Sequence, residues 1–310
     1  MERRYQEIPD NFDRIQEYVI TNKEEIAYEI ITAEKCFFYD TCAFRNHMLI
    51  SKPECLFEYI RQMNGIVVII RSIIMELCSG DNLLWEEHIA YIEKMHQYGI
   101  KILILYEEDV YCVLSACYSG TAVVNKMLSF AVRNVKMKTG VIEDVLNVDK
   151  LLRKEILFNQ ENYNRLLTAH FFEKMRAQKS SGDDLGETMI AVCVHMLSNI
   201  REVQESKYLI LTDDKRAITL LGKVMKNTEE YIGKKCITVI TTPKFCWLLL
   251  ERHINENIEQ IEDVLEHCST NGEIRLYCSE KFELSPRNVT MNSTVCAKKL
   301  VEDDGFKVYL

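Results

Sequence analysis

Short apolar runs that end in an acidic residue recur along this chain. Four stretches have the pattern, at 36–40, 73–76, 183–187 and 208–214. A short apolar run between polar residues is typical of a buried parallel strand, and open α/β sheets bind their ligands where such strands end. The pattern therefore predicts that acids from distant parts of the chain meet at one edge of a sheet.

Apolar runs alternate with segments of helical spacing over most of the chain. The runs predict strands at 36–40, 66–70, 100–106, 208–212, 236–241 and 273–278. The helical spacing predicts helices at 13–33, 54–63, 72–77, 85–98, 185–203, 215–227 and 242–252. Because strands that alternate with helices form βαβ units, we expect an α/β fold with a parallel central sheet flanked by helices.

Acids at several strand ends also predict a chemistry. Carboxylates that lie close together repel one another and raise one another's pKa, so a folded cluster of them needs a hard divalent cation. Mg²⁺ and Mn²⁺ prefer such oxygen ligands. One or two of these ions would activate a water molecule and neutralise charge on a leaving oxygen, which is the chemistry of phosphodiester hydrolysis.

Four motifs in a fixed order resemble those of a known family. An apolar strand ends in Asp-Thr at 37–41, and a Glu lies in the helix after the second strand at 69–77. Gly-Glu opens a helix at 186–191, and a strand runs into Thr-x-Asp at 209–214. In these motifs the chain resembles the PIN-domain nucleases, which are metal-dependent ribonucleases and flap nucleases. The separation between the second and third motifs is longer than in compact members of that family.

The resemblance implies a set of site residues. It gives four acids as catalytic residues and metal ligands: Asp40, Glu76, Glu187 and Asp214. Asp184 and Asp213 are further candidate ligands of Mg²⁺ or Mn²⁺. The inner ligand of the third motif stays open between Asp183, Asp184 and Glu187. The hydroxyls of Thr41 and Thr212 are expected to hydrogen-bond a ligating carboxylate or a water molecule beside it.

The chain divides into three regions under this interpretation. We expect an N-terminal helical segment at 1–34, a PIN-like nuclease domain at 35–250 and a small C-terminal appendage at 251–310. Residues 110–180 contain several helical patterns without a strong strand, so they are predicted to form a helical insertion. The insertion leaves after the third strand and returns to the third acidic stretch, which would bring it beside the acidic cleft.

Composition fits an intracellular globular enzyme. The chain has 310 residues, of which 47% are apolar, so it can bury a large core. Its twelve cysteines include no Cys-x-x-Cys pair and lie mainly in apolar runs, so most are expected to be reduced. The first residues are charged and no apolar run is long enough to cross a bilayer. We therefore expect a cytoplasmic protein with no membrane partner.

The net charge of −9 argues against a protein that coats nucleic acid, but a local basic rim is enough to bind a phosphate backbone. Candidate substrate-binding residues are Lys136 and Lys138 in the insertion and Lys215 and Arg216 after the last acidic stretch. Their alternative role is as a solvated helix face. We expect the substrate to be single-stranded or structured RNA. A protein partner, an antitoxin-like inhibitor and a homo-oligomer stay open.

Two other functions compete with an endoribonuclease. A non-catalytic module for nucleic acid or protein on a PIN-like fold has no need of all four acids. A haloacid-dehalogenase-like phosphatase also begins with a strand-end Asp, but it needs a second Asp two residues later, where this chain has Cys42. The sequence therefore favours a metal-dependent nuclease over both.

Overall fold

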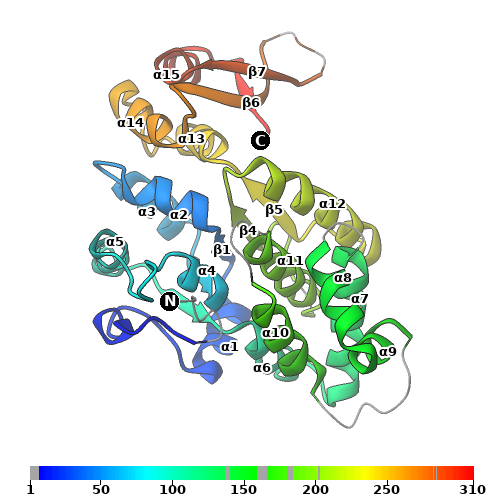
Figure 1. Ribbon diagram of the computed structural model, residues 1–310. Coiled ribbons are helices and arrows are strands. Elements are labelled where there is room, and N and C mark those ends of the chain that lie inside the picture. The colour runs from blue at the N-terminus through cyan, green and yellow to red at the C-terminus, as the bar shows by residue number, and fades with distance from the viewer. Residues whose placement is uncertain are drawn as a thin grey trace.

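A five-stranded, all-parallel sheet forms the centre of the fold (Figure 1). The computed structural model describes residues 7–136, 140–158, 166–179, 184–201, 203–281, 283 and 285–310, without the side chain of Lys136. The strands are β1 (Lys35–Tyr39), β2 (Gly65–Ile70), β3 (Ile102–Leu105), β4 (Tyr208–Leu211) and β5 (Ile237–Ile240), in the spatial order β3-β2-β1-β4-β5. The expected α/β fold with a parallel central sheet is confirmed.

The strand order places β1 and β4 side by side at the centre of the sheet. Phe38 of β1 lies opposite Val68 of β2 on one side and Ile210 of β4 on the other. All three side chains are buried, as are nearly all residues of the five strands. Parallel strands covered on both faces carry unbroken apolar runs, which is why the sequence pattern located them. Residues that follow β1 and β4 therefore meet at one edge of the sheet.

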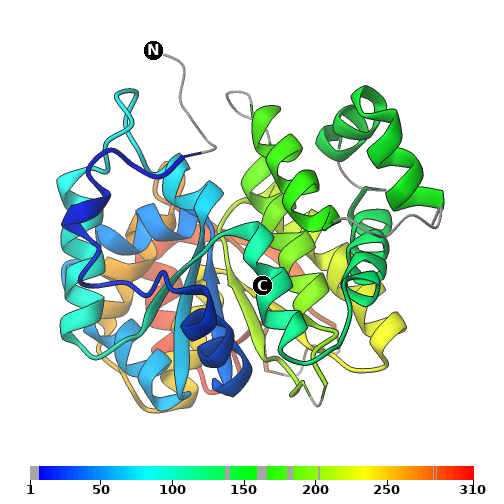
Figure 2. The ribbon, with the colours of Figure 1, turned by 90° about the horizontal axis from the view of Figure 1, so that it is seen from below.

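Helices cover both faces of the sheet. The helices that follow the strands are α2 (Thr41–Met48), α3 (Glu54–Gln62), α4 (Arg71–Glu76), α5 (Glu86–Gln97), α11 (Leu185–Leu197), α12 (Lys215–Ile232) and α13 (Thr242–Glu251). Figure 2 shows the blue and cyan helices α2, α3 and α5 on one side of the sheet and the green helices α7 (Thr121–Lys136) and α11 on the other. Helix α2 was not among the predicted elements.

The N-terminal segment is not the single helix expected at 13–33. It contains a short 3-10 helix, η1 (Phe12–Arg14), and an α-helix, α1 (Lys23–Thr32). Between them, Ile20 adds to the edge of the sheet: its N–H donates to the carbonyl of Ile102 (2.8 Å), and its carbonyl accepts from the N–H of Ile104 (3.0 Å). Asn22 then caps α1. Ile20 therefore pairs with β3 and is not helical, although the apolar side chains of this segment have helical spacing.

Residues 110–180, expected to be a helical insertion, contain helices and no strand over the part that the structure describes. These are α6 (Val110–Ser115), α7, α8 (Gly140–Val148), α9 (Lys150–Phe158) and α10 (Leu167–Ala177), preceded by the 3-10 helix η2 (Glu107–Asp109). In Figure 1 they lie on the side of the sheet that α11 also covers.

A buried ionic cluster fastens α10 to the carboxyl ends of β2 and β3. Arg176 donates to Glu107 and to Glu108, at 2.9 Å each, and Arg71 donates to Glu108 (2.5 Å). Glu107 is fully buried and also accepts from the N–H of Ser72 (2.7 Å). Removing one partner would leave an uncompensated buried charge, so the cluster fixes the end of α10 at this edge of the sheet.

The C-terminal residues form a second, antiparallel sheet of order β7-β6-β8, backed by helices (Figure 1). The elements are α14 (Ile258–Cys268), β6 (Glu273–Ser279), β7 (Arg287–Asn292), α15 (Ser293–Glu302) and β8 (Lys307–Val308). The predicted strand at 273–278 is confirmed. Strands β7 and β8 were not predicted, because β7 is mostly polar and β8 has two residues. Helices α14 and α15 were not predicted either.

All twelve cysteines lie in the described part of the chain, where none forms a disulfide, and seven of them are buried. Over the same residues, no helix is both long and apolar enough to span a membrane.

Candidate active site

Asp40 lies at the end of β1, at the centre of the sheet edge. It is 1% exposed, and its carboxylate accepts three hydrogen bonds. Oδ1 accepts from the N–H of Thr41 (2.7 Å), and Oδ2 accepts from Oγ1 of Thr212 (2.8 Å) and from Sγ of Cys42 (2.9 Å). Burial raises the pKa of Asp40, and the donors from Cys42 and Thr212 offset part of that effect. These contacts fix the carboxylate between the ends of β1 and β4.

Glu76, the last residue of α4, lies next to Asp40. Its Oε2 accepts from Oγ1 of Thr41 (2.6 Å), so Thr41 contacts both acids. Its Oε1 pairs with Nζ of Lys179 (2.6 Å), and the two side chains are 15% and 7% exposed. The ionic cluster at Arg176 holds the end of α10, three residues before Lys179, at this edge. The predicted insertion thus supplies a cation to the acids.

Glu187 enters the cluster from the first turn of α11. A Cβ added to the preceding Gly186 would lie 3.0 Å from both carboxylate oxygens of Glu76 and 2.8 Å from Cδ1 of Ile73. Glycine therefore lets α11 approach Glu76 closely. Burial raises the pKa of Glu187 to about 8, and the carboxylates of Asp40, Glu76 and Asp214 raise it as well. The other three catalytic candidates therefore act on Glu187 electrostatically.

Asp214 follows β4 and caps α12. Its Oδ1 accepts from the N–H groups of Arg216 (2.6 Å) and Ala217 (3.0 Å). An acid at a helix N-terminus also interacts favourably with the helix dipole. Asp214 therefore has a structural role in addition to its electrostatic effect on Glu187.

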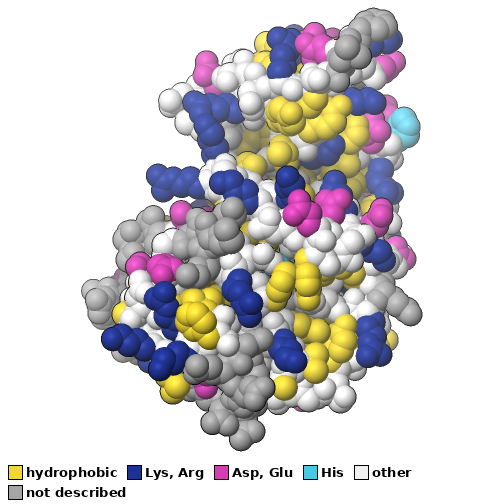
Figure 3. All heavy atoms as spheres, turned by 90° about the vertical axis from the view of Figure 1, so that its right-hand side faces the viewer, with side chains coloured by type: hydrophobic (Ala, Val, Ile, Leu, Met, Phe, Trp, Pro, Cys, Tyr) yellow, Lys and Arg dark blue, Asp and Glu magenta, His cyan; other side chains and the backbone are white. Residues whose placement is uncertain are grey.

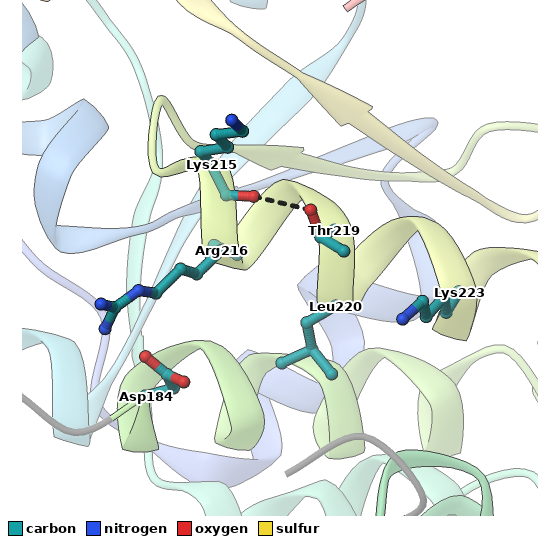
Figure 4. Close-up of a pocket in the computed structure, with 7 residues that line it drawn as sticks. Asp184, Lys215, Arg216, Thr219, Leu220 and Lys223 are labelled. Carbon is teal, nitrogen blue, oxygen red and sulfur yellow. Dashed lines mark hydrogen bonds between the residues drawn. The ribbon is translucent and has the colours of Figure 1, made fainter.

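Asp184 and Glu187, the two described acids of the third acidic stretch, have different surroundings. Asp184, just before α11, lines a groove beside α12, and Figure 4 shows it facing Arg216. The carboxylates of Asp40, Glu76 and Asp214 each raise the pKa of Glu187, after the larger effect of burial. Asp183 lies outside the described residues. Of the two described candidates for the inner ligand, Glu187 is on the helix whose Gly186 packs against the carboxylate of Glu76.

Asp213 has a different environment from Asp214. Its Oδ1 accepts from the N–H of Thr242 (2.7 Å), and its Oδ2 accepts from Oγ1 of Thr242 (2.6 Å) and Nδ2 of Asn46 (2.9 Å). Oγ1 of Thr242 also contacts Nε2 of His47 (2.9 Å), whose pKa is lowered to about 4 by burial. Both oxygens of Asp213 are thus engaged in joining the end of β4 to the start of α13.

Asp213→Ala is expected to lower the free energy of unfolding by about 1 to 3 kcal/mol, because the N–H of Thr242 loses its acceptor. Urea denaturation measures the change, with the exposed Asp304→Ala as the matched control. Unchanged stability combined with a loss of cation binding would instead make Asp213 a ligand.

The basic candidates fall into two groups. Lys215 and Arg216, together with Lys223, line the groove along α12, which has a volume of about 330 Å³ and reaches Asp184 (Figure 4). Lys138 lies outside the described residues, and of Lys136 only the backbone, at the end of α7, is described. Lys223 was missed in the sequence, although its spacing of seven from Arg216 puts both on one face of a helix.

Thr41 and Thr212 donate hydrogen bonds to Glu76 and Asp40, respectively. Two further residues of the site were not predicted, Cys42 and Lys179. Cys42 donates to Asp40, two residues before it, and accepts from the N–H of Asp213 (3.2 Å), and Lys179 pairs with a Glu that precedes it by 103 residues. The contacts with Asp213 and Glu76 join distant segments, so they depend on the tertiary fold and leave no local pattern.

The donor set suits a hard cation by its chemistry. Carboxylate oxygens are the ligands that Mg²⁺ and Mn²⁺ prefer. Burial raises the pKa values of Asp40 and Glu187, and neighbouring carboxylates raise both further, an effect that a cation would offset. In the described part of the chain, however, no three His, Cys, Asp or Glu side chains stand close enough together to hold a metal ion. Binding an ion through three of the acids therefore requires their side chains to move from the positions that the structure describes.

Comparison with models of protein families, with curated proteins and with solved structures finds no match to this chain.

Proposed function

We propose that this protein is a Mg²⁺- or Mn²⁺-dependent nuclease of the PIN-like type that hydrolyses phosphodiester bonds within RNA. The observation that carries the proposal is the position of Asp40, which Thr41 and Thr212 fix at the ends of the two central strands. Glu76 bonds to the same Thr41, and the helix of Glu187 packs against Glu76 at Gly186. Burial and the neighbouring carboxylates also raise the pKa of Glu187 to about 8, and acids with perturbed pKa values gather at functional sites.

The fold supports the proposal through the position of the acids. Asp40 and Asp214 follow the adjacent central strands β1 and β4, and parallel α/β sheets bind ligands at that edge. Glu76 and Glu187 come from helices that pack against each other at Gly186. Acidic residues from four separate segments thus lie near one edge of the sheet.

Each acid has a distinct task in this proposal. A bound divalent cation supplies Lewis-acid chemistry, which activates water and stabilises charge on the phosphate. Asp40, held by Thr41, Thr212 and Cys42, would be the fixed ligand of such a cation. Glu187, whose pKa is raised to about 8, would hold a proton near neutral pH and would lose it on binding the cation. Asp214 would be a third ligand.

Glu76 has the remaining task. Thr41 and Lys179 orient the carboxylate of Glu76. In this proposal its negative charge makes the electrostatic potential at the site more negative, and its oxygens hold water molecules at the edge of the site. The Lys179 ammonium also keeps one positive charge beside the acids, which favours the approach of a phosphate.

The groove along α12 is suited to the phosphate backbone of the substrate. Lys215, Arg216 and Lys223 line it together with Asp184, and Lys215 directly follows Asp214, the N-cap of α12. Cations on a polyanion track supply affinity without reading sequence. The groove would thus lead one strand toward the site in a protein whose net charge is −9.

Charge reversal of Arg216 and Lys223 together is expected to weaken RNA binding and to flatten its dependence on salt, by about 0.7 in the log–log slope for each phosphate that is no longer neutralised. Fluorescence anisotropy over a salt series measures both quantities. Lys226→Glu is the matched control, since Lys226 is on the same helix but does not line the groove. An equal effect of Lys226→Glu would show that Arg216 and Lys223 belong to a solvated helix face and do not bind RNA specifically.

Cleavage of an end-labelled, single-stranded RNA by the purified protein tests the proposed function. We expect internal cleavage with Mg²⁺ or Mn²⁺ and none with EDTA. RNA binding without cleavage would favour the non-catalytic alternative. Release of phosphate from a phosphomonoester with no cleavage of RNA would favour a phosphatase, although Cys42, a thiol bound to Asp40, stands where that family needs an acid.

A further inference from the structure

The antiparallel sheet of the C-terminal unit has one buried and one open face. Ile274, Leu276 and Cys278 of β6 are buried on the side of α14 and α15. The alternate residues Arg275 and Tyr277 point the other way and are exposed or half-buried. Successive residues of a strand point to opposite faces of the sheet, so Arg275, Tyr277 and the residues paired with them form a second surface. We call this surface the outer face.

The outer face carries two tyrosines next to each other. Tyr309 follows β8, and its N–H donates to the carbonyl of Tyr277 (2.8 Å). The two rings have centroids 6.1 Å apart at an angle of 64°, and Tyr309 is 43% exposed. The hydroxyl of Tyr309 also contacts Oγ of Ser279 (3.3 Å), which holds the ring over the sheet. Two aromatic rings are therefore fixed at an open surface.

Polar and basic side chains surround the tyrosines. Arg275 lies opposite Thr290, Tyr277 lies opposite Asn288, and Ser279 lies opposite Lys307. The strand positions of the outer face carry two cations, one acid (Glu273) and no aliphatic side chain. A protein interface with a dry core needs aliphatic or larger apolar groups, whereas aromatic rings beside cations and amides suit unpaired bases on a phosphate backbone.

The outer face is joined to the candidate active site by the first turn of α13. Thr242 bonds to Asp213, beside Asp214, and Lys244 donates from Nζ to the carbonyl of Val308 (2.5 Å), beside Tyr309. In Figure 3, hydrophobic side chains gather in the upper part of the molecule, and Lys and Arg side chains border them.

We propose that the outer face binds single-stranded nucleic acid, with unpaired bases stacked on Tyr277 and Tyr309 and phosphates near Arg275 and Lys307. Antiparallel sheets with exposed aromatic residues bind single strands in this way, because every base has a face that can stack. The inference extends the proposed nuclease function by defining the substrate as unpaired. Its test measures binding and not cleavage, so the two can fail separately.

The test compares variants by fluorescence anisotropy in EDTA, with labelled oligouridine, oligothymidine and a duplex as probes. The double variant Tyr277→Ala with Tyr309→Ala is expected to bind both single strands about tenfold or more weakly, on the scale of a stacked base. Its binding of the duplex should not change. Tyr28→Ala is the matched control, because Tyr28 is a 65% exposed tyrosine on α1.

A second pair of changes separates stacking from folding. Tyr277→Phe with Tyr309→Phe keeps both rings and should retain single-strand binding, since stacking needs the ring and not the hydroxyl. Single-strand binding that survives the alanine variant, or an equal loss for duplex and single strands, overturns the inference. A wild-type dimer that dissociates in the alanine variant overturns it too, because the face would then bind a second copy of the chain.

Discussion

Asp40→Asn is expected to abolish cation-dependent cleavage while the protein stays folded. Asp40 is the most deeply buried of the acids, and three donors fix it at the ends of the two central strands. An amide has the same shape but no charge, so it is a poor ligand for Mg²⁺. We expect activity to fall by more than about a hundredfold, since removing a group that merely supports a ligand already costs 10 to 100-fold.

Two comparisons make this result specific. Asp214→Asn should also abolish cleavage, and it should keep α12 intact because Asn caps helices as well as Asp. Asp304→Asn, at an exposed position, should cleave like the wild type. Thermal unfolding in EDTA should find Asp40→Asn no less stable than the wild type, since a buried, repelled carboxylate has been removed. Wild-type turnover in Asp40→Asn would refute the role of the acids.

Glu187→Gln is expected to remove a large pH dependence from the stability of the metal-free protein. The ordinary pKa of the residue is 4.5, and in the folded protein it is about 8. Between these values the folded state binds more protons than the unfolded state, so the free energy of unfolding falls as pH rises. The stabilising contribution is complete below pH 4.5 and is lost as pH rises through about 8.

Urea denaturation in EDTA over this pH range measures the effect. At 1.36 kcal/mol per pKa unit the wild type loses at most about 5 kcal/mol to this group, and side-chain rearrangement reduces that value. Glu187→Gln should therefore be more stable than the wild type above pH 8. Glu259→Gln, an exposed Glu in the first turn of α14, is the matched control. Parallel curves for wild type and Glu187→Gln would show that Glu187 is not in a repulsive cluster.

The central sheet was predictable because its strands are buried on both faces. Unbroken runs such as 66–70 and 208–211 are long enough to mark parallel strands, and the helices between them have clear spacing. The N-terminal segment was not predictable, because Ile20 pairs with a strand that lies far away along the chain. The strands β7 and β8 were missed since exposed strand residues give no apolar run.

The sequence was enough to predict which segments supply the acids of the candidate site, but not the role of each acid. Neighbours such as Asp213 and Asp214 cannot be told apart by motif, since only the fold decides which one meets Thr242 and which one caps α12. Lys179 was not predictable as a partner of Glu76, because the ionic cluster at Arg176 positions it. Sequence patterns record local preferences, whereas these assignments depend on contacts between distant segments.

Binding of Mn²⁺, followed by electron paramagnetic resonance of the free ion, tests the central claim that the four acids form a cation site. The wild type is predicted to bind Mn²⁺ saturably and to release a proton at about pH 7, because Glu187, with a pKa of about 8, must lose its proton to become a ligand. Asp40→Asn should weaken this binding, and Asp304→Asn should not. Absence of saturable binding by the wild type, or equal binding by Asp40→Asn, would contradict the account.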